Sequence, residues 1–123
     1  MIVEGGKNKV EDKMKILDYT TAGGKNLIET FIKDLGKKDQ IEAGRIRRSI
    51  RQDGAIALEA LNTRHLRGKL WEIKFSANRI MYVIQDAETI YFLHACKKQK
   101  NKAEKFELDK AIKRAKEAGL KVD

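Results

Sequence analysis

The sequence predicts an α+β fold, in which a small antiparallel sheet packs against two N-terminal helices and is followed by a C-terminal helix. The predicted sheet combines an N-terminal strand with a three-stranded meander. Apolar residues recur at helical spacing in 26–51 and after residue 101, whereas residues 70–96 have the alternating β-branched and aromatic pattern of strands. The chain of 123 residues is the size of one domain, so we expect a single domain over residues 1–123.

The N-terminal region is predicted to contain one strand. Residues 1–12 show no periodic pattern, which indicates a flexible arm. Residues 14–19, MKILDY, have the composition of a short strand, and the pair Gly23-Gly24 then marks a turn.

Two helices are predicted next, and each starts with the spacing of a capping box. Asn26 with Glu29, and Asp39 with Glu42, place an N-cap residue three positions before an acid. The first helix has one apolar face and ends before Gly36. The second has an apolar side formed by Ile41, Ile46 and Ile50. Its arginines are expected in solvent, namely Arg45, Arg47, Arg48 and Arg51.

Three consecutive strands form the predicted meander. In the segment LWEIKF, Trp71 alternates with Glu72 and Lys74, so we expect Trp71 in the core and the two charged residues on an open face. Residues 79–85 and 89–96 follow after short turns. The third strand is apolar on both faces, which predicts a central position in the sheet.

The remaining segments are a short helical turn at 55–61, a basic loop at 62–68 and a C-terminal helix. Asn101 and Glu104 have the spacing of a capping box at the start of that helix. The helix is rich in lysine and has a partly apolar face, formed by Phe106, Leu108, Ile112, Ala115 and Leu120.

The charge of the chain is strongly positive and unevenly distributed. Of the formal net charge of +9, residues 64–123 contribute +7, because they hold 15 basic and 8 acidic side chains. A positive field of this kind attracts polyanions, and RNA and DNA are the main candidates. A membrane partner is not expected, since no stretch approaches the roughly 20 apolar residues of a spanning helix. The polar start of the chain carries no signal-peptide pattern, and the single Cys96 suits a reducing compartment, so we expect a cytoplasmic protein.

Four motifs in the second half occur in a characteristic order. These are Leu66-Arg67-Gly68, Leu70-Trp71-Glu72, Arg79 with Tyr82, and the segment from Phe92 to Lys98. Together with the order of elements, they resemble the RelE/ParE superfamily, and most closely its HigB-like, phage-derived branch. The resemblance covers roughly residues 13–118. In that family a proline usually follows shortly after the lysine pair, whereas this chain has no proline, and Asn101 could cap the helix instead.

The resemblance implies a toxin of a type II toxin–antitoxin pair. Such a toxin cleaves mRNA, commonly on the ribosome, and is held inactive by an antitoxin, here expected to be HigA-like with a helix-turn-helix. The fold implied is RelE-like.

Cleavage of RNA by its own 2′-OH needs a base, an acid and cations around the phosphate. We expect Arg79 to hold the phosphate, because guanidinium offers two parallel donors and stays charged. Lys98 could hold phosphate or donate a proton, and Lys74 with Glu72 could act as a base and its electrostatic partner. The alternatives are a surface arginine, a solvated lysine and an ordinary cross-strand ion pair. RNA contacts are expected from Arg67, Lys69, His65, Lys97, Lys100 and Lys102.

Other candidate groups are assigned to packing. His94 alternates with apolar residues and is expected to be a hydrogen-bonded core residue, Tyr82 to pack, and Cys96 to be an inert small hydrophobe. No metal or other cofactor is expected, because two histidines and one cysteine make a poor zinc set and no cluster of acids suits magnesium.

Two other functions use the same features. A ParE-like toxin of the same fold would poison DNA gyrase, and a non-catalytic module would only bind nucleic acid. The presence of Arg79, Lys98 and Lys74 favours the nuclease over the gyrase-poisoning toxin. The lack of a recognisable nucleic-acid-binding motif disfavours the non-catalytic module. The antitoxin is expected on the two helices rather than over the active face, because Leu27, Phe31 and Leu35 offer apolar area beside the arginines of the second helix.

Overall fold

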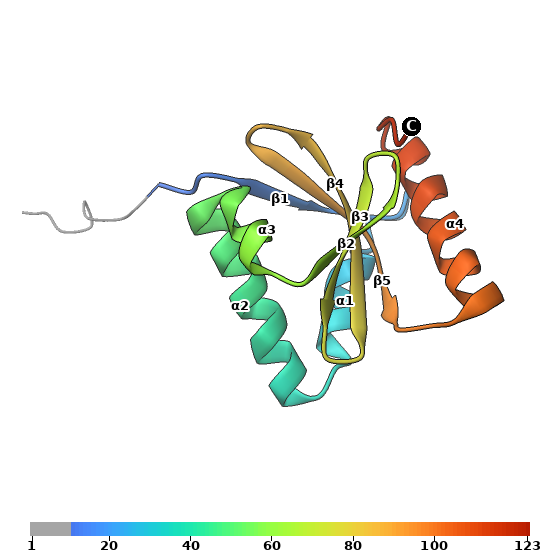
Figure 1. The fold of residues 1–123 in the computed structure, drawn as a ribbon, viewed down its shortest axis with the longest axis horizontal. Helices are drawn as coiled ribbons and strands as arrows, with labels where there is room; N and C mark the ends of the chain where they lie inside the picture. The colour runs from blue at the N-terminus through green and yellow to red at the C-terminus, as the bar shows by residue number, and fades with distance from the viewer. Residues whose placement is uncertain (1–10) are drawn as a thin grey trace, which may run out of the picture.

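The computed structural model describes residues 11–123 and confirms the α+β class (Figure 1). Residues 1–10 of the predicted arm lie outside the described residues. The elements, in chain order, are β1 (Lys15–Asp18), α1 (Leu27–Lys33), α2 (Lys37–Asp53), α3 (Ile56–Ala60), β2 (Thr63–Arg67), β3 (Leu70–Phe75), β4 (Asn78–Asp86), β5 (Thr89–Lys97) and α4 (Asn101–Glu117).

The sheet has five strands in the order β1-β5-β4-β3-β2 and is mixed. Strands β3 to β5 pair antiparallel, as predicted for the meander, and β2 adds a further antiparallel strand, but β1 pairs parallel with β5. A parallel pair needs a long connection, and here three helices and three strands separate the two partners in the chain. The prediction of an entirely antiparallel sheet was therefore wrong for β1. Strand β5 is internal, as its apolar faces indicated.

Strand β2 replaces the basic loop predicted at 62–68. It pairs only with β3 and forms the edge of the sheet, so its side chains are exposed or half-buried. An edge strand needs no apolar alternation, and it can carry charged side chains that discourage pairing with other chains. The sequence TRHLR therefore lacks the pattern by which a strand is recognised.

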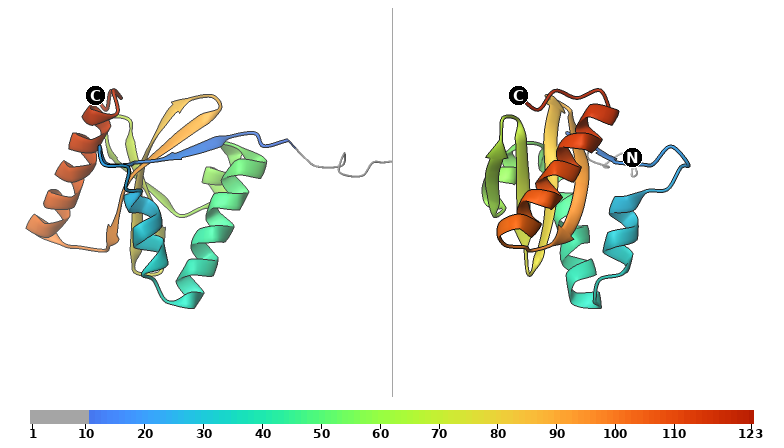
Figure 2. Two further views of the ribbon diagram at one scale, coloured as in Figure 1. Left: turned by 180° about the vertical axis from the view of Figure 1, so that it is seen from behind. Right: turned by 90° about the vertical axis from the view of Figure 1, so that its right-hand side faces the viewer.

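Helices cover both faces of the sheet (Figure 2). Helices α1, α2 and α3 pack on one face, with a core that includes Ile28, Ile50, Ile73 and Phe92. Helix α4 packs on the other face through Ala111 and Ala115, against Leu70, Met81 and Leu93. Because alternate side chains of β4 and β5 enter the two cores, these two strands are apolar on both faces, whereas β3 carries Glu72 and Lys74 on the face toward α4.

One of the three predicted capping boxes forms its cap. The Glu29 amide donates to Asn26 Oδ1 at 2.9 Å and starts α1 as predicted. Helix α2 instead begins at Lys37, before Asp39, whose carboxylate accepts a hydrogen bond from Asn78 Nδ2 at 3.0 Å. Helix α4 has Lys100 at its N-cap position, and Asn101 adopts a positive φ of 57°. Tertiary partners thus compete with local capping for polar side chains.

Two side chains lie opposite to their predicted environments. Arg47 is not in solvent: it donates to both carboxylate oxygens of Asp18, at 2.9 and 2.8 Å, and lies over the Phe92 ring. Trp71 is not in the core: it is 39% exposed and contacts His65 edge-on, with ring centroids 5.2 Å apart. On one side Trp71 pairs with His65 of β2, the edge strand of the sheet, and beyond this edge few residues are available to cover a large ring.

Gly68, in the turn between β2 and β3, allows a close backbone approach. Its φ is +54°, and a Cβ added there would overlap the carbonyl oxygen of Val122. The neighbouring Lys69 amide donates to the same oxygen at 2.5 Å, so this contact fastens the C-terminal tail to the hairpin.

We expect Gly68→Ala to lower the free energy of unfolding by about 1–3 kcal/mol, because it combines an unfavourable φ with a steric overlap. Urea denaturation monitored by circular dichroism measures this. The matched control is Gly44→Ala in α2, where an added Cβ meets nothing within 4 Å. That change is expected to stabilise the helix by about 0.5–1 kcal/mol. Equal stabilities of the two variants would contradict the role given to Gly68.

Candidate functional site

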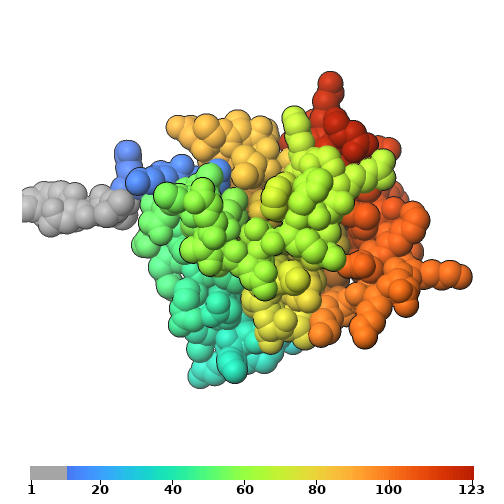
Figure 3. Space-filling view, in the orientation of Figure 1, coloured from blue at the N-terminus to red at the C-terminus, as the bar shows by residue number. Residues whose placement is uncertain are grey.

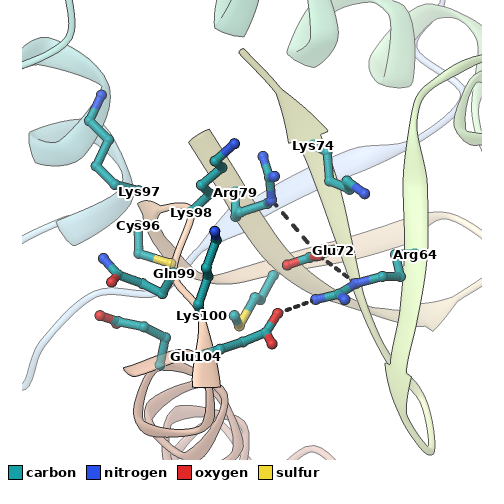
Figure 4. Close-up of a pocket in the computed structure, with 12 residues that line it drawn as sticks. Arg64, Glu72, Lys74, Arg79, Cys96, Lys97, Lys98, Gln99, Lys100 and Glu104 are labelled. Carbon is teal, nitrogen blue, oxygen red and sulfur yellow. Dashed lines mark hydrogen bonds and ion pairs between the residues drawn. The ribbon is translucent and has the colours of Figure 1, made fainter. Parts of the chain in front are cut away.

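A cleft of about 230 Å³ opens between the sheet and the start of α4 (Figure 4). We call it the cationic cleft. Its charged lining residues are Arg64, Lys74, Arg79, Lys97, Lys98 and Lys100, together with Glu72, Glu104 and Glu107. Figure 3 shows the β2–β3 hairpin and the first part of α4 meeting on one face of the molecule. All four predicted catalytic residues, Arg79, Lys74, Glu72 and Lys98, are therefore brought to one place.

Arg79 is held by several contacts at the start of β4. Its Nη1 donates to the carbonyl oxygens of Asn78, at 2.8 Å, and Ser76, at 3.5 Å. Its Nε lies 4.0 Å from Glu72 Oε2, and its side chain is 17% exposed. A guanidinium fixed in this way loses little freedom when it binds an anion, which is the property expected of a phosphate clamp.

Glu72 forms the buried floor of the cationic cleft. Its carboxylate accepts from Arg64 Nε at 2.8 Å, and only 2% of the side chain is exposed. Arg64 also donates through Nη2 to Glu104 at 2.5 Å, so one guanidinium connects β3 to α4. The hydrogen bond to Glu104, assisted by the charge of Glu72, raises the pKa of Arg64 against the opposing effect of burial. The pair expected between Glu72 and Lys74 is thus replaced by a pair with Arg64.

The lysines after β5 point in different directions (Figure 4). The Lys98 amide donates to the Ala77 carbonyl at 2.8 Å, which fixes the strand end beside the β3–β4 turn. Lys98 and Lys100 then extend along the side of the cleft on which Arg79 lies, as Figure 4 shows. Lys97 points away, since its Nζ donates to Asn78 Oδ1 at 2.8 Å and lies 5.9 Å from the centre of the Phe31 ring. The Lys97 side chain is therefore hydrogen-bonded toward the face of the sheet that α1 covers.

Four predicted RNA-binding residues lie outside the cationic cleft. Arg67 pairs with Asp123 at 3.2 Å, and His65 Nε2 lies 2.7 Å from the Gly68 carbonyl oxygen. Lys69 and Lys102 are exposed. A role of these four in RNA binding stays a prediction.

Sequence reasoning missed Arg64, Glu104 and Glu107 as site residues. Arg64 directly faces Glu72 in the β2–β3 register, so recognition of β2 as a strand would have placed it. Glu104 and Glu107 are separated by almost one helical turn near the start of α4, and their position depends on how that helix docks.

His94 is buried in a hydrogen-bonded network beneath the cleft, which confirms its expected core position. Its Nε2 lies 2.5 Å from Glu107 Oε1, and its Nδ1 lies 2.9 Å from Arg114 Nη1. Because a guanidinium can only donate, Nδ1 must accept and Nε2 must carry the proton. Burial lowers the pKa of His94, although the hydrogen bond to Glu107 opposes this.

His94, Cys96 and Glu107 also place one potential metal-binding atom each within 4.8 Å of one another. The proton on His94 Nε2 and the nearby charge of Arg114 both disfavour a cation there. Burial raises the pKa of Cys96 to about 12, so its thiol is not a ready thiolate ligand. These three residues therefore fit a hydrogen-bonded core better than a metal centre.

The lowered pKa of His94 predicts a pH dependence of stability. As the pH falls through about 6.5, His94 in the unfolded chain binds a proton before the folded chain does. The free energy of unfolding should therefore fall between pH 7.5 and pH 5.5, and fall less in His94→Gln, which cannot titrate. Urea denaturation of both proteins at the two pH values measures the difference. Parallel pH dependences would show that His94 is not the titrating group.

Tyr82 and Cys96 behave as buried core groups. Tyr82 is 3% exposed, and burial raises its pKa to about 12. Cys96 is 8% exposed. Both confirm the assignment to packing rather than to a reactive or stacking role.

The fold and the site define a class: small α+β proteins with a five-stranded mixed sheet and a cationic cleft beside the C-terminal helix. Residues 30–116 match the family of phage-derived, Gp49-like proteins (DUF891). Because the match spans well over half of the chain, the protein belongs to this family, which lies among the RelE/HigB-like toxins of toxin–antitoxin systems. Family membership also implies an antitoxin partner.

A search of curated proteins finds no match to the chain. Within residues 11–123, no helix is both long enough and apolar enough to cross a membrane.

Proposed function

We propose that this protein is a metal-independent endoribonuclease that cuts mRNA, on the ribosome, and so inhibits translation. The observation that carries this proposal is the cationic cleft, in which Arg79, Lys74, Lys98 and Lys100 gather around the buried carboxylate of Glu72. Four cations around a cleft of about 230 Å³ suit a single phosphate group with its attached sugars.

The proposed reaction uses the RNA's own 2′-OH. The 2′-oxygen bonds to the adjacent phosphorus and its proton passes to a base, while the bond from phosphorus to the 5′-oxygen breaks. The leaving 5′-oxygen takes up a proton. The products are a 2′,3′-cyclic phosphate and a 5′-hydroxyl end.

The residues of the cleft have distinct roles in this reaction. Arg79 stabilises the negative charge that builds up on the phosphate, because its donors are fixed before the substrate binds. Lys98 gives the proton that the leaving 5′-oxygen needs, and Lys74 is the base that accepts the proton of the 2′-OH. Glu72 acts through its contacts with Arg64 and Arg79, as a positioning residue. Lys100 adds positive charge at the rim.

The acids of the cleft support a mechanism without a metal. Glu72 and Glu104 both accept hydrogen bonds from Arg64, and Glu107 is paired with His94. Each acidic side chain of the described cleft lining thus already has a hydrogen-bonding partner, and the positive charge of Arg64 beside Glu72 and Glu104 disfavours a divalent cation there.

The proposed partner is a HigA-like antitoxin that binds the α1–α2 side. Ile41 is 54% exposed there, next to the exposed Arg45 and Arg48, which suits a partner with apolar and acidic groups. Leu35 is buried, so the apolar area predicted on α1 is smaller than expected.

We expect the toxin–antitoxin complex to bind a short 2′-deoxy-blocked RNA about as tightly as the free toxin, because the cationic cleft lies on the opposite side of the sheet from α1 and α2. Fluorescence anisotropy of labelled RNA measures this. Mutual exclusion of RNA and antitoxin would place the inhibitor over the cleft instead.

A further inference from the structure

A second cleft adjoins the cationic cleft on the side of β2 and α4. It has a volume of about 280 Å³ and shares Arg64, Met81 and Glu104 with the cationic cleft. To these it adds two leucines, Leu66 and Leu108, and three polar residues, His65, Asn101 and Lys105. We call it the side cleft. Since three residues line both clefts, the two clefts are adjacent.

We infer that the side cleft binds a nucleobase of the RNA whose phosphate lies in the cationic cleft, and that it prefers guanine. This inference rests on the proposed nuclease function. A nucleotide joins a flat base, with apolar faces and polar edges, to a charged phosphate through one sugar, so it matches a cleft with both leucines and polar groups beside a cationic one. A phosphate alone would occupy the cationic cleft and leave the side cleft empty.

The walls of the side cleft suit the faces of a base. Leu66 and Leu108 are half-buried and pack against the core under α4, and Met81 is 2% exposed. Apolar walls of this kind gain free energy when a ring displaces water from them. A volume of about 280 Å³ is near the lower end of small-molecule sites, as expected for a ligand the size of a single base.

Glu104 gives the side cleft its selectivity. Its carboxylate accepts from Arg64 Nη2 through Oε2, as the dashed line in Figure 4 marks, and the residue lines both clefts. An ionised carboxylate can only accept hydrogen bonds, and it has capacity for more than one. Guanine presents two adjacent donors on its Watson–Crick edge, N1–H and the N2 amino group. Adenine and cytosine present one donor beside an acceptor, and uracil presents one donor between two carbonyl oxygens, so each of these three faces the carboxylate less favourably.

The test is an RNA-binding experiment on the full chain. Labelled pentanucleotides carry a 2′-deoxy sugar at the cleavage position, so that binding is measured without cleavage. In one series an abasic sugar replaces each base in turn, and in a second series the base at the sensitive position is guanine, adenine, cytosine or uracil. We expect one abasic position to raise the Kd roughly tenfold, which is the usual effect of losing one base contact. Guanine should bind most tightly at that position.

Two variants connect the effect to the side cleft. Leu108→Asp alters a residue that lines the side cleft but not the cationic cleft, and it should make intact and abasic RNA bind equally. Glu104→Gln should reduce the preference for guanine. If Leu108→Asp does not fold, the abasic series on the unaltered protein decides.

The outcomes separate this inference from the proposed function. If no abasic position changes the Kd while Arg79→Ala still weakens binding, the base site is wrong and the phosphate site stands. If a base effect occurs but guanine is not preferred, the selectivity given to Glu104 is wrong. If Arg79→Ala leaves the Kd unchanged, the proposed function fails as well.

Discussion

Arg79→Ala is expected to lower the rate of RNA cleavage by about 10²–10³-fold, equivalent to about 2.7–4 kcal/mol of transition-state stabilisation, in a protein that stays folded. The magnitude is taken from the loss of one fixed donor to a developing negative charge in other enzymes. The Arg79 side chain is 17% exposed and donates to two carbonyl oxygens of a turn, so its removal should lower the free energy of unfolding by about 1–3 kcal/mol, a loss that leaves a typical domain folded.

The measurement is a single-turnover cleavage rate, accompanied by thermal unfolding. Arg48→Ala is the matched control, because Arg48 is an exposed arginine on α2 outside the cationic cleft. Arg79→Lys should recover part of the rate, since it restores charge without the planar pair of donors. Full activity in folded Arg79→Ala would remove Arg79 from the site.

Glu72→Gln is expected to lower both stability and activity. The carboxylate is buried and accepts from Arg64 Nε at 2.8 Å, and hydrogen bonds to charged groups contribute about 1.5–3 kcal/mol each. Glutamine keeps the size and an acceptor oxygen but loses the charge that holds Arg64 and Arg79. We therefore expect unfolding at lower urea concentration and a cleavage rate reduced roughly tenfold or more.

The pH profile separates a positioning role from a role as base. If Glu72 acts through the arginines, the Gln variant is slower at every pH and its profile keeps the same shape. If Glu72 takes the proton of the 2′-OH, the acidic limb of the profile disappears in the variant. The second result would overturn the role proposed here for Glu72.

The sequence predicted those parts of the fold that depend on local pattern. Asn26 caps α1 as expected, and β3, β4 and β5 follow the alternation and turn signals. It did not predict β2, because an edge strand pairs on one side only and needs no apolar face. Asp39 and Glu104 fit a capping pattern, yet Asn78 and Arg64 bind them instead, and neither partner is near in the sequence.

For the candidate site too, the sequence predicted the parts that depend on local pattern. Arg79 and Lys98 lie at strand ends whose antiparallel pairing brings them together, and a period of two places Glu72 and Lys74 on one face. The contacts that organise these groups were not predictable. Arg64 comes from the unrecognised strand, and Glu107 enters the cleft only because α4 docks on the sheet beside His94.

The pairing of Arg47 with Asp18 shows a further limit of pattern reading. Helical periodicity placed Arg47 on the polar side of α2, where solvent is the simplest expectation. The parallel strand β1 lies beside that helix and supplies a buried carboxylate, with 6% of the Asp18 side chain exposed. A charged residue that looks solvent-facing in the sequence is thus part of the interior.

The most direct test of the account is to map the ends of an mRNA in a reconstituted translation reaction, with the unaltered protein and with Arg79→Ala, alongside a gyrase supercoiling assay. The account predicts new 5′-hydroxyl ends, matched by 2′,3′-cyclic phosphate ends, with the unaltered protein alone, and undisturbed gyrase activity. Intact mRNA together with blocked supercoiling would contradict it and identify gyrase as the target. Intact mRNA with normal supercoiling would contradict it in favour of a protein that binds nucleic acid without cutting it.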